Sequence, residues 1–190
     1  MKKIVAGVDE VGRGSLIGPV YAAAVILKRN IDKSKIKDSK KLTNKNREIL
    51  EKYIKKNSYW SIGSASLKEI EKLNILNASL LAMKRAIKKL IKKPSYVLID
   101  GNKIPEIKNY KIKCIVKGDE KIPQISAASV IAKVTRDRFV KKLSKKFTKY
   151  AWDKNAGYGT KLHLKAIKKF GVTIYHRKKF SPIHNMLSPN

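Results

Sequence analysis

The sequence has little cysteine, since Cys114 is the only one among its 190 residues. A lone cysteine excludes an internal disulfide and any zinc cluster built from several cysteines. The sequence also has no apolar run near the roughly 20 residues that cross a membrane. Its first apolar run, at 4–8, is too short for the core of a signal peptide and leads directly into Asp9 and Glu10. We therefore expect a cytoplasmic protein without a membrane partner.

Acidic residues are also scarce, with 14 Asp and Glu against 45 Lys and Arg, which gives a formal net charge of +31. Such an excess favours a polyanionic partner, most simply nucleic acid. Most of the basic residues are lysines spread along the whole chain beside abundant Ile and Asn, a composition that an AT-rich genome also produces. Net charge alone therefore leaves two interpretations open, a nucleic-acid surface or lysines on solvated faces.

The sequence contains no internal repeat and no low-complexity linker. Its length and its 43% content of hydrophobic residues suit one folded domain with a substantial core. We expect residues 1–190 to form a single domain, with about 150–190 as a helical or irregular C-terminal extension of it. A monomer is the default expectation for the oligomeric state.

Apolar runs at 4–8 and 20–27, separated by glycines and Pro19, predict a β-hairpin. Three further apolar runs predict strands, at 59–65, 96–99 and 113–116. Helical periodicity and capping residues predict helices, beginning after Thr43 and Ser66 and extending over 76–90, 127–146 and 162–170. The tail after Gly171 is predicted to be irregular. Meandering strands, followed by strands that alternate with helices, predict a mixed α/β sheet covered by helices.

Carboxylates follow three of the predicted strands: Asp9 with Glu10, then Asp100, then Asp119. Open α/β sheets place their sites at the carboxyl ends of strands, and clustered carboxylates repel one another unless a cation neutralises them. Without several cysteines or paired histidines, the ligand set is all oxygen, which suits Mg²⁺ or Mn²⁺. The alternative is that each Asp-Gly or Gly-Asp pair is merely a turn, which is the simpler explanation for any one of them alone.

Asp9 and Glu10 pose a geometric difficulty, because adjacent residues on a regular strand point to opposite faces. We expect the strand to end or bulge at this place, since Gly12 and Gly14 permit such a break. Two divalent ions roughly 3.5–4 Å apart would activate a water and stabilise the leaving oxygen of a phosphodiester. On this hypothesis the carboxylates hold metal and no side-chain nucleophile is needed.

Many motifs occur in an order that is typical of one family, namely VDEVGRGSLIGPV, DSKKLT, EIEKLNILNASLLAM, LIDGN, KGDEKIPQISAASVIAKVTRDR, GYGTKLH and HRKKF. Over nearly its whole length the chain resembles the bacterial type 2 ribonucleases H, the ribonuclease HII family. The resemblance implies a ribonuclease H-like fold, a mixed five-stranded sheet flanked by helices with a helical C-terminal part. It also implies endonucleolytic cleavage of the RNA strand of RNA/DNA hybrids, leaving 5′-phosphate and 3′-hydroxyl ends.

The resemblance carries over residue by residue to the functional positions. The four acids of the family correspond to Asp9, Glu10, Asp100 and Asp119, which implies the catalytic and metal-binding set for two Mg²⁺ or Mn²⁺ ions. The Gly-Arg-Gly element of the family corresponds to Gly12, Arg13 and Gly14, whose backbone is expected to meet the ribose 2′-hydroxyl, the group that distinguishes RNA from DNA.

Tyr158, in GYGT, matches the tyrosine that packs on the deoxyribose after a ribonucleotide. Together with the Gly-Arg-Gly element it implies recognition of a 5′-RNA–DNA-3′ junction, including one ribonucleotide inside duplex DNA. The implied roles are ribonucleotide excision and primer removal. In DSKKLT, Ser39 and Lys40 are candidate phosphate contacts, although a turn and a solvated lysine are equally open.

The sequence also departs from the family pattern. Val11 stands where alanine is commoner, a change of little consequence. The C-terminal element at 173–180 lacks the usual Pro and Ser, which places any contact made by those positions in doubt but not the metal site. The tail lacks the paired aromatics of a sliding-clamp motif, so we expect no such partner.

Several other polar residues have two interpretations. Lys133, Arg136 and Arg138 either contact substrate or form ion pairs with acids such as Asp137, and Ser126 and Ser129 either cap a helix or contact the substrate backbone. His163 and His176 are expected to make structural hydrogen bonds rather than to act as general acids.

Two other functions remain open alternatives at this point. One is a DNA nuclease or junction resolvase of the same superfold, against which the Gly-Arg-Gly and GYGT elements argue. The other is a non-catalytic basic RNA-binding protein. Four acids at strand ends would suit that role poorly, because without metal they repel phosphate.

Overall fold

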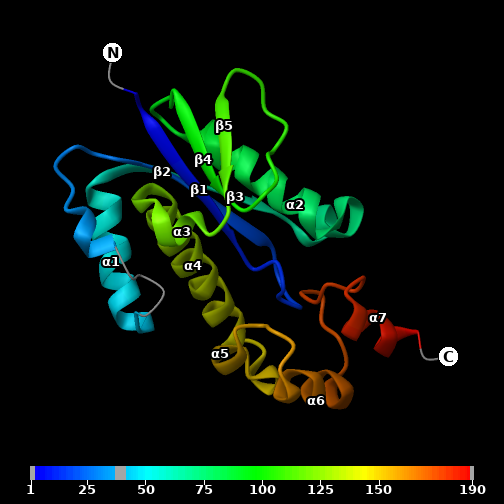
Figure 1. The fold of residues 1–190 in the computed structure, drawn as a ribbon. Coiled ribbons are helices and arrows are strands. Elements are labelled where there is room, and N and C mark those ends of the chain that lie inside the picture. Colours follow the sequence, from blue (N-terminus) through cyan, green and yellow to red (C-terminus); the bar gives the residue numbers. More distant parts are fainter. Residues whose placement is uncertain (1–2, 37–41, 189–190) are drawn as a thin grey trace.

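A computed structural model of the chain describes residues 3–36 and 42–188. Its sheet has five strands, β1 (Val5–Val11), β2 (Val20–Leu27), β3 (Ser58–Ala65), β4 (Tyr96–Asp100) and β5 (Lys111–Ile115). Their order is β3-β2-β1-β4-β5, with antiparallel pairing of β1–β2 and β2–β3 and parallel pairing of β1–β4 and β4–β5. The predicted hairpin and mixed five-stranded sheet are confirmed (Figure 1).

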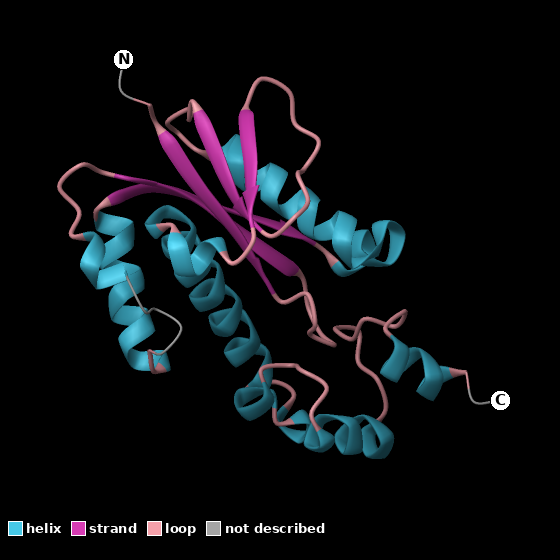
Figure 2. Cartoon of the chain, viewed as in Figure 1, coloured by secondary structure: helices cyan, strands magenta, loops and turns pink. Residues whose placement is uncertain are grey.

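Helices cover both faces of this sheet (Figure 2). The long helix α2 (Leu67–Lys89) packs on one face, against the alternate β1 residues Ala6 and Val8. The other face is covered by α1 (Asn44–Lys56) and α4 (Pro123–Ser144), which pack against Ala23 and Val25 of β2. Because side chains alternate along a strand, each strand contributes to two separate cores.

Local signals place the starts of two helices as predicted. Thr43 caps α1 and accepts a hydrogen bond from the Asn46 amide, and Ser66 forms a capping box with Glu69 at the start of α2. Within α2, Asn74 adopts a non-helical backbone with a positive φ (φ 65°, ψ 170°), which divides the helix into the two segments expected from the sequence. In α1, Leu50 and Ile54 lie on the buried face, whereas Ile49 is 59% exposed.

Short helices account for the other differences. Asp119 lies in the one-turn helix α3 (Gly118–Lys121) rather than directly at the end of a strand, and α4 begins at Pro123 instead of residue 127. The segment at 151–160, for which no helix was predicted, contains α5 (Trp152–Asn155), and the predicted irregular tail contains α7 (Ser181–Leu187). These helices are too short for apolar periodicity to reveal them.

A third apolar cluster joins the C-terminal part to the rest of the chain. Trp152, Ile167 of α6 (Lys161–Phe170) and Ile183 of α7 pack around Leu16 and Ile17 of the β1–β2 loop. Two 3₁₀ turns, η1 (Lys33–Ile36) and η3 (Thr148–Tyr150), complete the elements. This packing places the segment around residue 158 beside the β1–β2 loop. Within the described ranges no helix is long and apolar enough to span a membrane.

Candidate active site

Asp9 lies near the end of β1 and faces α4. It pairs in register with Ala23 of β2, whose side chain belongs to the core under α4. The Asp9 carboxylate accepts a hydrogen bond from the Glu10 amide over 2.7 Å, and only 6% of the residue is exposed. A carboxylate at this depth requires either a proton or a nearby cation.

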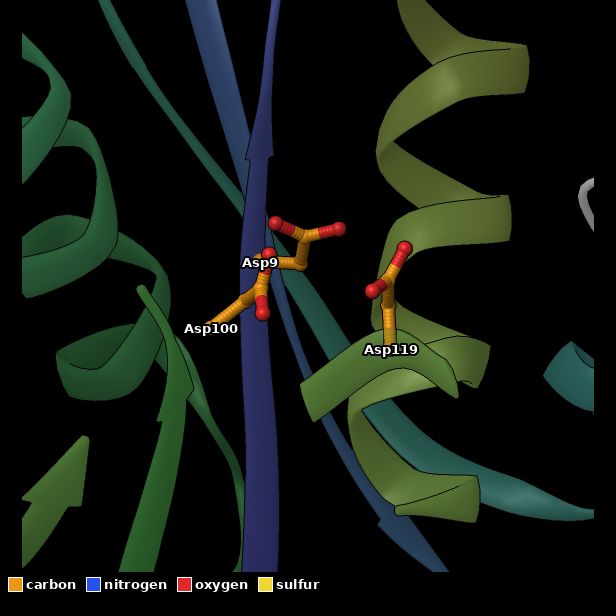
Figure 3. A group of neighbouring side chains, drawn as sticks. All are labelled: Asp9, Asp100 and Asp119. Atoms are coloured by element: carbon orange, nitrogen blue, oxygen red, sulfur yellow. The ribbon is translucent and has the colours of Figure 1, made fainter. Parts of the chain in front are cut away.

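Three carboxylates meet at this edge of the sheet. One oxygen each from Asp9, Asp100 and Asp119 lies within 4.8 Å of the others, and Figure 3 shows the side chains converging from β1, β4 and the short helix α3. The Gly118 amide donates a hydrogen bond to Oδ1 of Asp100 over 2.7 Å, which ties the start of α3 to the end of β4. Three of the four predicted acids are therefore brought together.

Gly7 makes this convergence possible and was missed by the sequence reasoning. It lies two residues before Asp9, on the same face of β1, and a Cβ there would lie 2.1 Å from the carbonyl carbon of Gln124. The first turn of α4 therefore packs directly against the β1 backbone. Because α3 immediately precedes α4, this packing also places Asp119 close to Asp9. The signal in the sequence is a glycine inside an apolar strand, which often marks a close backbone approach.

The electrostatics of the group follow from its burial. Burial raises the pKa of the Asp9 carboxyl well above its usual range, and the charges of Glu10 and Asp100 raise it further, while a hydrogen bond from Ser129 opposes the shift. Burial also raises the pKa of Glu10. Like charges held this close fit a bound cation, and a set of carboxylate oxygens suits a hard divalent ion.

Glu10 does not take the position that we expected. The β1–β2 pairing continues regularly through Asp9, Glu10 and Val11, so the strand neither ends nor bulges there. Glu10 pairs with Ala22 of the α2 core and therefore points to the opposite face from Asp9. Its Oε1 lies 3.3 Å from Nη1 of Arg13. The expected break in strand alternation is thus wrong, because regular pairing with β2 holds the strand straight.

The Gly-Arg-Gly element and Tyr158 lie side by side. Ser15 and Tyr158 form an isolated antiparallel bridge, and the Leu16 amide donates to the Gly157 carbonyl over 2.8 Å. A Cβ at Gly14 would lie 3.8 Å from Cε1 of the Tyr158 ring. The half-buried tyrosine therefore flanks the backbone that was predicted to approach a ribose.

Some of the remaining candidate residues make structural contacts, and others lie at the acidic group. Ser126 donates to the Ile36 carbonyl over 3.1 Å, whereas Ser129 hydrogen-bonds to Asp9 at the acidic group. Lys133 and Arg136 pair with Asp137 over 3.0 and 3.4 Å, which confirms the expected local ion pairing, whereas Arg138 pairs with the distant Glu51 over 3.0 Å. Ser39 and Lys40 lie outside the described residues.

The two histidines make the structural hydrogen bonds that the sequence predicted. Both are buried, and His163 accepts from the Trp152 indole over 2.8 Å. His176 Nδ1 accepts from the Thr173 amide over 2.8 Å. These bonds connect the C-terminal segments to one another.

Known proteins resemble this chain in sequence. The family described as Ribonuclease HII matches residues 6–183. The chain is 72% identical over 185 residues to Ribonuclease HII of Pelagibacter ubique (strain HTCC1062), covering 97% of this chain and 100% of that relative.

Two solved structures resemble the fold closely. The ribonuclease H2 of Pyrococcus horikoshii OT3 has a TM-score of 0.80 at 27% identity over 96% of each chain. The structure of Bst-RNase HIII in complex with Mn²⁺ has a TM-score of 0.77 at 18% identity, covering 97% of this chain and 69% of that one. The expected ribonuclease H-like fold is confirmed.

Proposed function

The chain belongs to the ribonuclease HII family and is a ribonuclease H-type hydrolase acting on RNA/DNA, and we propose that it also incises duplex DNA at single embedded ribonucleotides. The proposed products carry 5′-phosphate and 3′-hydroxyl ends. The observation that carries this proposal is the contact between the Gly-Arg-Gly loop and the Tyr158 ring beside the acidic group. The proposed cellular roles are ribonucleotide excision and primer removal in the cytoplasm.

Asp9, Asp100 and Asp119 are the proposed ligands of Mg²⁺ or Mn²⁺, because one carboxylate oxygen of each converges on the same place. A neighbouring fold, Bst-RNase HIII, is known in complex with Mn²⁺. When bound, two such ions supply an activated water and neutralise charge on the leaving oxygen. We keep Glu10 as a fourth proposed acid, since Asp100 is close enough to raise its pKa.

Two backbone amides and one serine side chain hydrogen-bond to the acids of this group. The Gly118 amide fixes one oxygen of Asp100, and the Glu10 amide and Ser129 hydrogen-bond to Asp9. Hydrogen bonds to a carboxylate favour its charged form. Because they are already formed, the ligand oxygens need little reorganisation when a cation enters.

Substrate recognition is proposed to use two adjacent loops. The backbone of Gly12, Arg13 and Gly14 would meet the 2′-hydroxyl of the ribonucleotide, and the Tyr158 ring would pack on the following deoxyribose. Since Gly14 and Tyr158 are in contact, the two sugars they recognise are neighbours on one strand. This pairing favours a 5′-RNA–DNA-3′ junction over uniform DNA. Ser39 and Lys40 remain proposed phosphate contacts.

One assay tests the substrate class. The protein is incubated with Mg²⁺ or Mn²⁺ and three matched duplexes: DNA with one ribonucleotide, an RNA/DNA hybrid and all-DNA. We expect cleavage of the first two only, with 5′-phosphate and 3′-hydroxyl products shown by end-group analysis. Cleavage of the all-DNA duplex would instead favour a DNA nuclease, and an intact single-ribonucleotide duplex would contradict recognition of the junction.

A further inference from the structure

Two fully buried arginines lie beneath the contact between the Gly-Arg-Gly loop and Tyr158. Arg136 comes from the middle of α4 and is 1% exposed, and Arg177 comes from the C-terminal segment and is 0% exposed. Arg136 has one carboxylate partner, since its Nη1 lies 3.4 Å from Oδ1 of the half-buried Asp137, and in the described part of the chain no carboxylate pairs with Arg177. Buried arginines with so little compensation are costly. Their placement therefore calls for a reason beyond packing.

Arg177 holds the two ends of the β1–β2 loop. Its Nη1 donates to the Arg13 carbonyl over 2.8 Å, and its Nε donates to the Gly18 carbonyl over 3.0 Å. The Arg177 amide also donates to the Leu16 carbonyl over 2.8 Å. One residue thus fixes three backbone carbonyls of the loop that contains the Gly-Arg-Gly element. Its guanidinium thus restricts the backbone conformation of a loop whose glycines would otherwise allow many conformations.

Arg136 connects this loop to the tyrosine. Its Nη2 donates to the Ser15 hydroxyl over 2.8 Å and to the Ala156 carbonyl. Its guanidinium carbon lies 4.9 Å from the centroid of the Tyr158 ring. Gly12, at a φ of +92°, leaves the space that Arg136 occupies, since a Cβ there would lie 2.8 Å from Nε. Arg136 therefore touches both recognition elements.

In the described part of the chain, one nitrogen of each arginine has no hydrogen-bond partner, Nε of Arg136 and Nη2 of Arg177. Burial, with the charge of Arg136 adding to it, lowers the pKa of Arg177 to about 9. The fold thus accepts two incompletely compensated cations at this place. A neutral core would be more stable here, which points to a functional use of the donors.

We propose that Arg136 and Arg177 are positioning residues that hold the Gly-Arg-Gly backbone and the Tyr158 ring at the spacing of two consecutive sugars. The proposal rests on the proposed function of this site. A junction substrate needs both contacts at once, whereas every nucleotide of an RNA strand offers a 2′-hydroxyl and none offers a deoxyribose. Loosening either arginine therefore lowers cleavage at a single ribonucleotide more than cleavage of a continuous hybrid.

The test uses Arg177→Lys and Arg136→Lys, which keep the charge but lose the forked hydrogen bonds. For each variant, kcat and KM are measured on the single-ribonucleotide duplex and on the hybrid, at a temperature below its unfolding. We expect the ratio of kcat/KM values, junction over hybrid, to fall about tenfold or more, since each lysine loses charge-assisted hydrogen bonds that hold one of the two sugar contacts.

Arg138→Lys is the matched control, because Arg138 lies on the same helix but pairs with Glu51. For Arg138→Lys, the ratio of kcat/KM values, junction over hybrid, should stay within about twofold of the wild-type ratio. Ser15→Ala keeps both arginines and removes the hydroxyl that accepts from Arg136 and also bonds to the backbone of Ile17 and Gly157, and it serves if a lysine variant does not fold. We expect it to lower the ratio in the same direction.

Equal losses on both substrates would assign the arginines a purely structural role and overturn the proposal. An unchanged ratio in the folded variants, or in Ser15→Ala if neither lysine variant folds, would overturn it as well. A wild-type protein that fails to cleave the junction would contradict the proposed function instead. The two failures are therefore distinguishable.

Discussion

At the scale of single residues, burial of the Asp9 carboxylate in the acidic group lowers the stability of the fold. Asp9 is almost fully buried, and both its burial and the neighbouring acids raise its pKa well above the usual range. A carboxyl whose pKa is higher in the folded than in the unfolded chain weakens folding when it is ionised. This arrangement is expected where a cation is to be bound rather than where a core is to be stabilised.

We predict that Asp9→Asn abolishes cleavage and stabilises the metal-free protein at neutral pH. The asparagine carbonyl can still accept from the Glu10 amide, while the buried charge is removed. The gain in unfolding free energy should be of order 1 kcal/mol, as at other functional sites. Thermal unfolding in EDTA measures it. The exposed Asp153→Asn should change neither stability nor activity, and a lower melting temperature for Asp9→Asn would contradict this explanation.

Tyr158 is predicted to act through its ring. Tyr158→Ala should lower cleavage at a single ribonucleotide by about tenfold or more, given the usual energy of aromatic stacking on nucleic acid. Tyr158→Phe keeps the ring and should retain most activity. Steady-state kinetics on the junction duplex and on the hybrid provide the measurement. If phenylalanine were as damaging as alanine, the hydroxyl rather than the ring would carry the contact.

At the scale of elements, the site depends on how closely α4 approaches β1. An alanine at Gly7 would place its Cβ 2.1 Å from the backbone of Gln124, so α4 and α3 would have to move away. We predict that Gly7→Ala lowers stability by roughly 1–3 kcal/mol and raises the metal concentration needed for half-maximal activity, because Asp119 moves with α3.

Gly171→Ala is the control for this substitution. Gly171, unlike Gly7, has a positive φ of +76°, but nothing lies within 4 Å of an added Cβ. Its substitution should cost only backbone strain of about 1–3 kcal/mol and leave the metal response unchanged. Equal metal dependence in Gly7→Ala and wild type would show that the approach of α4 does not set the position of Asp119.

The sequence predicts the elements better than it predicts their contacts. The strands and the capped starts at Thr43 and Ser66 were recognisable, because alternation and capping are local properties. The short helices α3, α5 and α7 were missed, since helices of so few residues depend on tertiary packing. The pairing register of β1 with β2 determines which face of the sheet Glu10 points to. A single sequence does not reveal that register.

The same limit applies to the candidate site. Asp9, Asp100 and Asp119 were identified from their positions after apolar runs, and the structure brings them together. Gly7 and Arg177 were not identified, because their roles arise from segments that are distant in sequence and adjacent only in the fold. A glycine in a strand was visible in the sequence, but what approaches it was not.

At the scale of the whole molecule, a buried histidine pair connects the C-terminal segments. The Trp152 indole donates to Nε2 of His163, so Nδ1 of His163 carries the proton toward the Tyr158 carbonyl, 2.9 Å away. His176 accepts at Nδ1 from the Thr173 amide. Burial lowers the pKa of His163, and burial together with the charge of His163 lowers the pKa of His176 to about 4. Both rings are neutral in the folded protein.

This pair predicts loss of stability in acid. Between pH 6.5 and about 4 the unfolded chain binds protons that the folded chain does not, so the free energy of unfolding decreases as pH falls through this window and is fully retained above it. Melting temperatures from pH 7 to 4 test this. His176→Gln should flatten the dependence, whereas the exposed His184→Gln should leave it unchanged. A steep dependence that persisted in His176→Gln would assign it to other groups.

The most direct test of the account is the effect of Asp100→Asn on cleavage and binding of a DNA duplex with one ribonucleotide. Asparagine can still accept from the Gly118 amide, so the fold should be kept while one ligand charge is lost. We predict that cleavage falls at least about 100-fold at every Mg²⁺ or Mn²⁺ concentration, beyond the loss from disturbing an outer-shell partner. Binding of the duplex in EDTA should be unchanged or tighter, because one charge fewer repels the phosphates. Full activity of Asp100→Asn would contradict the assignment of this acidic group as the metal-dependent active site.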